Sequence, residues 1–324
     1  MWRQGSFLGL AALLAGAAVA GPPRFALPLD CTLGENCYIQ NYVDTLPATG
    51  RVSDYACGPL SYDGHKGTDF ALFTRAQMAA GVSVTAAADG VVRGTRDTMP
   101  DTGLSAATEA AIAGRECGNG LVIDHGDGWV SQYCHMKRGS ITVQKGQAVQ
   151  TGDRLGQVGL SGQSEFPHLH FTLRQNERVI DPFDPDNTAT CGAAGQTLWA
   201  TPPAYVAGGL LGLGFASAVP PFDSIKAGTA HSPALAADAS ALVLWAYMFG
   251  TRAGDSLTLV ISGPEGFSFE HSTTLDKTQA LSFRAAGKRL RTAGWPVGPY
   301  QGHATLRRKG QIISAEAIRL QIKP

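Results

Sequence analysis

The sequence lacks the features that mark several common classes of protein. Its 26 basic and 26 acidic residues leave no net charge, so the overall charge does not indicate a nucleic acid or an anionic membrane surface as partner. Beyond the first twenty residues, no run reaches the roughly 18 apolar residues of a membrane-spanning helix, so we expect no stable membrane insertion. No repeat is evident, and the lack of any C-x-x-C pair argues against a thiolate metal site.

The first twenty residues have the composition of an export signal. A basic residue, Arg3, precedes an apolar run over residues 7–19, and an Ala-Val-Ala triplet that ends at Ala20 forms a small-x-small cleavage pattern. We therefore expect residues 1–20 to be a signal peptide that is removed. The mature protein would then act in the periplasm or outside the cell.

Export makes the six cysteines interpretable as a disulfide framework, because an oxidising compartment favours pairing. Six cysteines allow fifteen connectivities. One pair flanks a short loop, another brackets a predicted hairpin, and the remaining two would close a long loop. The pairings that we favour on these grounds are Cys31–Cys37, Cys117–Cys134 and Cys57–Cys191.

The length and the 40 glycines and 18 prolines predict a mainly β protein of two domains. We expect a disulfide-fixed lead-in over residues 21–59 and a first domain over residues 60–192. A linker over residues 193–203 would join it to a small immunoglobulin-like β-sandwich over residues 204–324, where β-prone runs recur between turns. A helix-prone insertion at 95–116 either covers a site or decorates an edge, and we favour the edge.

The clearest local signal is a hairpin. Two β-prone runs, residues 120–125 and 129–135, are separated by a Gly-Asp-Gly turn. Regular alternation along the second strand places Tyr133 and His135 on one face. It places Cys134 on the other, directed away from His135.

Two short motifs carry the chemistry. His65 and Asp69 stand four residues apart, and His168 and His170 two apart, so each pair shares one face of an extended strand. With His135, they give five groups that suit a divalent metal. A catalytic zinc site needs three protein ligands and one open position, so two groups would remain for acid/base work or for stabilising an oxyanion.

These residues resemble the lysostaphin/LytM-type zinc metallopeptidases, which cut peptide bonds in bacterial peptidoglycan. The resemblance rests on H-x(3)-D, on the histidine before the last motif and on H-x-H, in the family's order over about residues 60–184. It implies a compact antiparallel β-sheet metallopeptidase domain and one zinc ion held by His65, Asp69 and His170. It further implies His135 and His168 as catalytic residues, and the peptide stems or cross-bridges of the cell wall as substrate.

Two other functions are consistent with the residues. The same fold serves in proteins that bind the wall or regulate a hydrolase without cutting, although this chain keeps all five groups. A non-haem iron oxygenase also uses two histidines and a carboxylate, but its carboxylate usually stands two residues from a histidine.

The C-terminal domain shows no catalytic cluster, and an envelope protein is a candidate partner for it. We expect a chain that ends near residue 195 to keep zinc and some activity.

Overall fold

A computed structural model describes residues 21–46, 50–186, 191–192 and 195–324. The predicted signal peptide, residues 1–20, lies outside the described residues. The described part is mainly β, as predicted, and its short helices fall well below the length and hydropathy needed to span a membrane.

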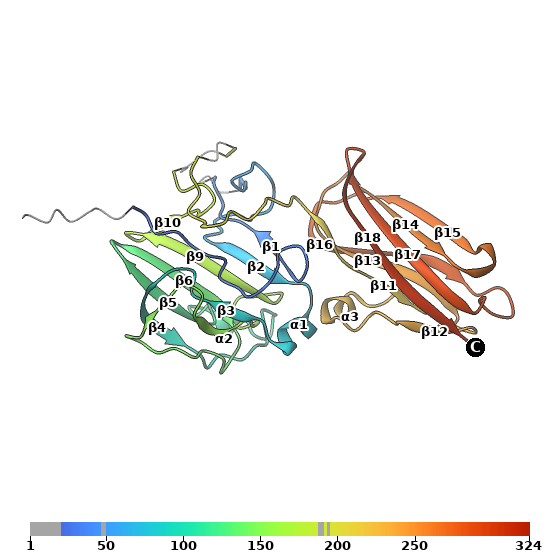
Figure 1. Ribbon diagram of the computed structural model, residues 1–324, viewed down its shortest axis with the longest axis horizontal. Coiled ribbons are helices and arrows are strands. Elements are labelled where there is room, and N and C mark those ends of the chain that lie inside the picture. Colours follow the sequence, from blue (N-terminus) through green and yellow to red (C-terminus); the bar gives the residue numbers. More distant parts are fainter. Residues whose placement is uncertain (1–20, 47–49, 187–190, 193–194) are drawn as a thin grey trace, which may run out of the picture.

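The first half of the chain is built on one antiparallel sheet of eight strands (Figure 1). Their order is β1-β2-β9-β6-β5-β4-β7, with β10 beside β9. The bounds are β1 (Cys37–Asn41), β2 (Thr68–Leu72), β4 (Gly90–Arg96), β5 (Asn119–Gly126), β6 (Trp129–Met136), β7 (Ala148–Val149), β9 (His168–Gln175) and β10 (Arg178–Ile180). A small sheet of β3 (Ser83–Thr85) and β8 (Arg154–Gln157), and the helices α1 (Arg75–Ala80) and α2 (Glu109–Ile112), flank it.

Only one face of the large sheet covers the main core. On β9, the central strand, the core-facing side chains Leu169, Phe171 and Leu173 are almost fully buried. Because side chains alternate along a strand, His168 and His170 point to the opposite face. The alternation that fills the core therefore also places this motif on the other face of the sheet. We call this face, which points away from the main core, the open face.

The second half of the chain is a β-sandwich. One sheet has the order β11-β13-β16, from β11 (Gly209–Ala216), β13 (Ala241–Thr251) and β16 (Gln279–Arg289). The other has the order β12-β18-β17-β14-β15, from β12 (Ala234–Ala236), β14 (Ser256–Ser262), β15 (Ser268–Thr274), β17 (Gly298–Arg308) and β18 (Gln311–Lys323). Apolar residues of both sheets share one core. The helix α3 (Phe222–Ala227) and a 3-10 turn, η1 (Pro264–Gly266), complete this half.

The sandwich packs directly on the first sheet. The outward side chains of β13, Tyr247 and Phe249 among them, form one buried apolar cluster with Tyr38 of β1 and Ala71 of β2. The rings of Tyr38 and Phe249 lie 4.6 Å apart. Phe166, from the loop before β9, packs against the same cluster. Figure 1 shows the sandwich beside the β1–β2 edge.

The three predicted disulfides are all present and account for all six cysteines. They join Cys31 to Cys37, Cys57 to Cys191 and Cys117 to Cys134. The spacing of cysteines around a local loop and a hairpin was therefore sufficient to choose among fifteen connectivities.

Candidate metal centre

The two motifs meet because β2 and β9 are neighbours. Asp69 stands directly opposite His170 in the ladder, and opposed residues of an antiparallel pair share a face. His65, in the loop before β2, completes the group. The Nδ1 atom of His170 lies 2.8 Å from Oδ1 of Asp69 and 3.1 Å from Nε2 of His65. Each residue offers one ligand atom, and the three atoms lie within 4.8 Å of one another.

Further contacts fix the orientation of these three side chains. The Nδ1–H of His65 donates to the carbonyl of Tyr42 over 2.6 Å, which leaves its Nε2 lone pair directed at the centre. The amide of Asn41 donates to Oδ2 of Asp69 over 2.9 Å. The hydroxyl of Thr172 lies 3.0 Å from Nε2 of His170.

These supporting residues were not found from the sequence. Thr172 extends H-x-H by two residues, so strand alternation gives a usable signal for it. Asn41 becomes a neighbour of Asp69 only through the pairing of β1 with β2. The acceptor for His65 is a backbone carbonyl, for which a sequence has no signature.

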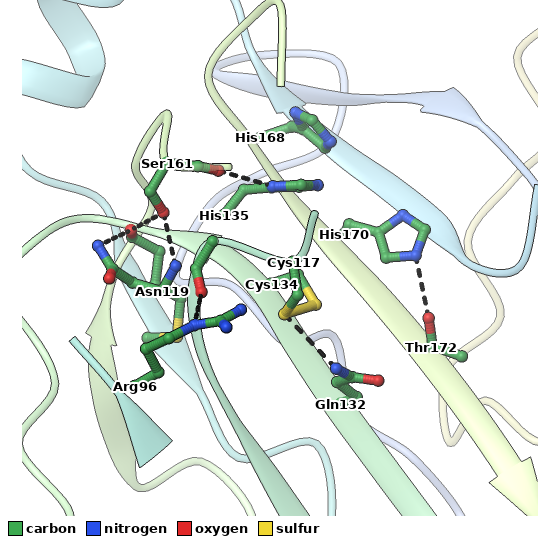
Figure 2. The surroundings of a disulfide bond; sticks show 12 residues. Arg96, Cys117, Asn119, Gln132, Cys134, His135, Ser161, His168, His170 and Thr172 are labelled. Atoms are coloured by element: carbon green, nitrogen blue, oxygen red, sulfur yellow. Dashed lines mark hydrogen bonds between the residues drawn. A yellow bond between two sulfur atoms is a disulfide. The ribbon is translucent and has the colours of Figure 1, made fainter. Parts of the chain in front are cut away.

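His135 and His168 lie beside the three candidate ligands. Their ring centroids are 4.7 Å apart, and Figure 2 shows both rings close to His170. Backbone carbonyls hold each Nδ1–H: Ser161 accepts from His135 and Phe166 from His168, both over 2.8 Å. Each Nε2 atom therefore keeps a lone pair, which suits proton acceptance.

The prediction that Tyr133 and His135 share one face of the strand, with Cys134 on the other, was wrong for a specific reason. Between the pairs Asn119–Met136 and Leu121–Tyr133, two residues of β6, Cys134 and His135, stand opposite one residue of β5. This is a β-bulge, and a bulge re-aims the side chains beyond it. Tyr133 is consequently fully buried in the core, whereas His135 reaches the open face.

Burial and neighbouring charge shift the pKa values of His65, His135, His168 and Asp69 in different directions. Burial, and then the nearby His168, hold the pKa of His135 well below its ordinary range, and burial lowers the pKa of His168. Burial alone would raise the pKa of Asp69, but the surrounding histidines bring it well below its usual value. Burial opposes protonation of His65, yet Asp69 outweighs it and raises that pKa. His135 and His168 are thus neutral bases beside an ionised carboxylate.

The close approach of His170 to the backbone between His65 and Asp69 requires a glycine at that position. A Cβ atom on Gly67, between His65 and Asp69, would stand 2.7 Å from the imidazole of His170 and from the carbonyl of Phe171. Any other residue would displace His170 or β9. This explains why the H-x-G-x-D motif has glycine at its centre.

Comparison with known proteins agrees with the geometry. Residues 63–182 match the model of peptidase family M23. These residues form an M23 peptidase domain. The resemblance predicted from the motifs is therefore confirmed, and the M23 domain contains all five candidate site residues. Their individual roles stay predictions.

Curated relatives match part of this chain. The peptidoglycan DD-endopeptidase ShyA of Vibrio cholerae is 36% identical over 117 residues, which cover 36% of this chain and 22% of ShyA. The cell division protein DipM of Caulobacter vibrioides is 40% identical over 87 residues, which cover 25% of this chain and 14% of DipM. The chain thus spans less than a quarter of either relative.

Two solved structures also match part of this chain. A zinc-containing peptidase from Vibrio cholerae is 28% identical with a TM-score of 0.33, covering 49% of this chain and 39% of that one. The catalytic domain of lysostaphin from Staphylococcus simulans is 22% identical with a TM-score of 0.28, covering 44% of this chain and 86% of that one.

Proposed function

We propose that the protein is an exported, zinc-dependent endopeptidase that hydrolyses peptide bonds in the stems or cross-bridges of peptidoglycan. The observation that carries the proposal is the grouping of His65, Asp69 and His170 beside two further imidazoles, whose Nδ1 atoms face backbone carbonyls and whose Nε2 atoms are left for proton transfer. The printed function of ShyA, a peptidoglycan DD-endopeptidase, supports the choice of substrate.

The donor set fits zinc. Two imidazole nitrogens and one carboxylate oxygen are ligands that zinc accepts, and three protein ligands are the number typical of a catalytic site. The bond from His65 to the Tyr42 carbonyl is the kind of outer contact that fixes a ligating histidine. When bound, zinc supplies a Lewis acid and lowers the pKa of water to about 7.

The other two histidines supply proton transfer. His135 and His168 are neutral, and their Nδ1–H groups are held by carbonyls, so each presents Nε2 as the accepting atom. One takes the proton of the attacking water. The imidazolium so formed stabilises the negative charge on the scissile carbonyl and then protonates the leaving amine. His170 instead turns Nδ1 toward Asp69, which suits a ligand rather than a base.

The surroundings of the site support a location in the cell envelope. Three disulfides among the described residues are typical of an oxidising compartment.

The sheet β11-β13-β16 already packs on the M23 domain. We therefore expect an envelope protein that binds the sandwich to contact a surface away from this sheet.

Removal of the metal distinguishes an enzyme that cuts peptidoglycan from a protein that only binds it. We expect a chelator to reduce the release of new amino groups from purified peptidoglycan to background, and added zinc to restore it. The measurement is amino-group labelling of the soluble fraction, with elemental analysis of the protein. A zinc-loaded protein that pellets with the wall yet releases no amino groups would favour the non-catalytic alternative. Iron in place of zinc would favour the oxygenase.

A further inference from the structure

One residue of the bulge that turns His135 toward the site forms a disulfide. Cys134, the first residue of the bulge, is bonded to Cys117, which directly follows the 95–116 segment. Cys134 stands opposite His170 in the β6–β9 ladder, so the disulfide lies on the open face. Figure 2 shows it between His135, His170 and Gln132. The amide of Gln132 is 3.5 Å from the sulfur of Cys117.

His135 has a backbone conformation that needs support. Its φ is +62°, in the left-handed region that residues other than glycine rarely occupy. Such a conformation persists where the surroundings over-determine it, and it is often found at functional sites. Without such support, β6 would relax toward regular alternation, which turns the side chain of residue 135 away from the open face.

Cys117 holds both residues of the bulge. Its sulfur is bonded to Cys134, and its carbonyl accepts the N–H of His135 over 2.8 Å. Close packing behind the bulge depends on glycine, since a Cβ atom on Gly120 would stand 2.1 Å from the carbonyl of Tyr133. Ser161 then fixes the ring through Nδ1. The disulfide is therefore the covalent part of the support for His135.

We propose that the Cys117–Cys134 disulfide is a positioning device for His135, and that turnover depends on its being oxidised. The inference rests on the proposed endopeptidase function. A dithiol reductant opens the bond: the disulfide takes up two electrons and two protons to give two thiols, while the dithiol is oxidised to its cyclic disulfide. His65, Asp69 and His170 are held by other contacts, so zinc stays bound.

The test compares full-length, zinc-loaded C117S/C134S with the wild type and with C31S/C37S, which removes the other short-range disulfide. We expect kcat on a defined muropeptide to fall about 10- to 100-fold in C117S/C134S, the effect of a misplacement of about 1 Å. KM and zinc content should stay unchanged, and C31S/C37S should match the wild type. The His135 amide should exchange with solvent faster in C117S/C134S, because its bond to Cys117 is weakened.

A second arm of the test uses the wild type alone, so it does not depend on the folding of C117S/C134S. Wild-type protein is reduced in steps with dithiothreitol, and peptide mapping locates the opened bonds. Loss of kcat should follow the opening of Cys117–Cys134 and reverse on reoxidation. Unchanged kcat with that bond open, or zinc loss in parallel with kcat, would overturn the proposal. If the oxidised wild type cuts no peptide, the endopeptidase function fails instead, and amide exchange at His135 alone decides on the positioning.

Discussion

Replacing His168 with alanine should abolish most turnover and leave zinc bound, whereas replacing His170 should lose the metal. His170 brings Nδ1 to 2.8 Å from the Asp69 carboxylate, while Nε2 of His168 stays at 3.5 Å, outside the group of three ligand atoms. Loss of a positioned general base costs about 10²- to 10⁴-fold in rate. Zinc content by elemental analysis and kcat on a defined muropeptide separate the two variants.

The matched control is His303→Ala, which removes an exposed histidine of the sandwich. It should change neither zinc content nor kcat. Equal zinc loss from His168→Ala and His170→Ala would show that the division of roles within H-x-H is wrong. Wild-type turnover by His168→Ala would shift the role of base to His135.

Removing the sandwich should destabilise the M23 domain and lower its turnover, whereas the sequence alone led us to expect a shortened chain that keeps zinc and some activity. A chain of residues 21–203 would expose Tyr38, which is 5% exposed in the full chain, together with Phe73 and Phe166 of the same cluster. Complete burial of one such side chain stabilises a protein by about 1.5–3 kcal/mol. The shortened chain also loses the bond from Tyr205 to buried Asp54.

The effect should extend to catalysis through Phe166. Its ring stacks on His168 at 4.4 Å, and its carbonyl holds the Nδ1–H of that histidine. We expect the Tm of residues 21–203 to fall and kcat to drop at least tenfold, the order of loss expected when a catalytic group is misplaced. Calorimetry and muropeptide kinetics measure both.

A full-length Phe166→Leu variant serves as the control for local packing. It keeps the carbonyl and the sandwich, so it should lose less activity than the shortened chain. If residues 21–203 keep the wild-type Tm and kcat, the sandwich is an independent module and the original expectation holds.

Local patterns in the sequence were sufficient for the hairpin, the disulfides and the grouping of the motifs. The Gly-Asp-Gly turn joins β5 to β6 as predicted, because turn chemistry and strand alternation are local properties. The bulge at Cys134 and His135 was missed, since one extra residue reverses every later side chain and depends on the partner strand.

The packing between the two halves was also beyond a sequence argument. Trp245 of β13 lies outside the sandwich core, in the cluster that joins the sandwich to β1 and β2. Both faces of β13 are apolar and buried, so its sequence does not show which face meets which partner. Apolar surface without alternation is consistent with either arrangement.

Mass spectrometry of a defined, cross-linked muropeptide tests the central claim most directly. With zinc-loaded, oxidised full-length protein, we predict two products whose masses sum to that of the substrate plus one water. A chelator or His168→Ala should leave the substrate whole, and added zinc should restore cleavage after chelation. An intact substrate with zinc-loaded wild type, under conditions in which a known wall peptidase cuts it, would contradict the account.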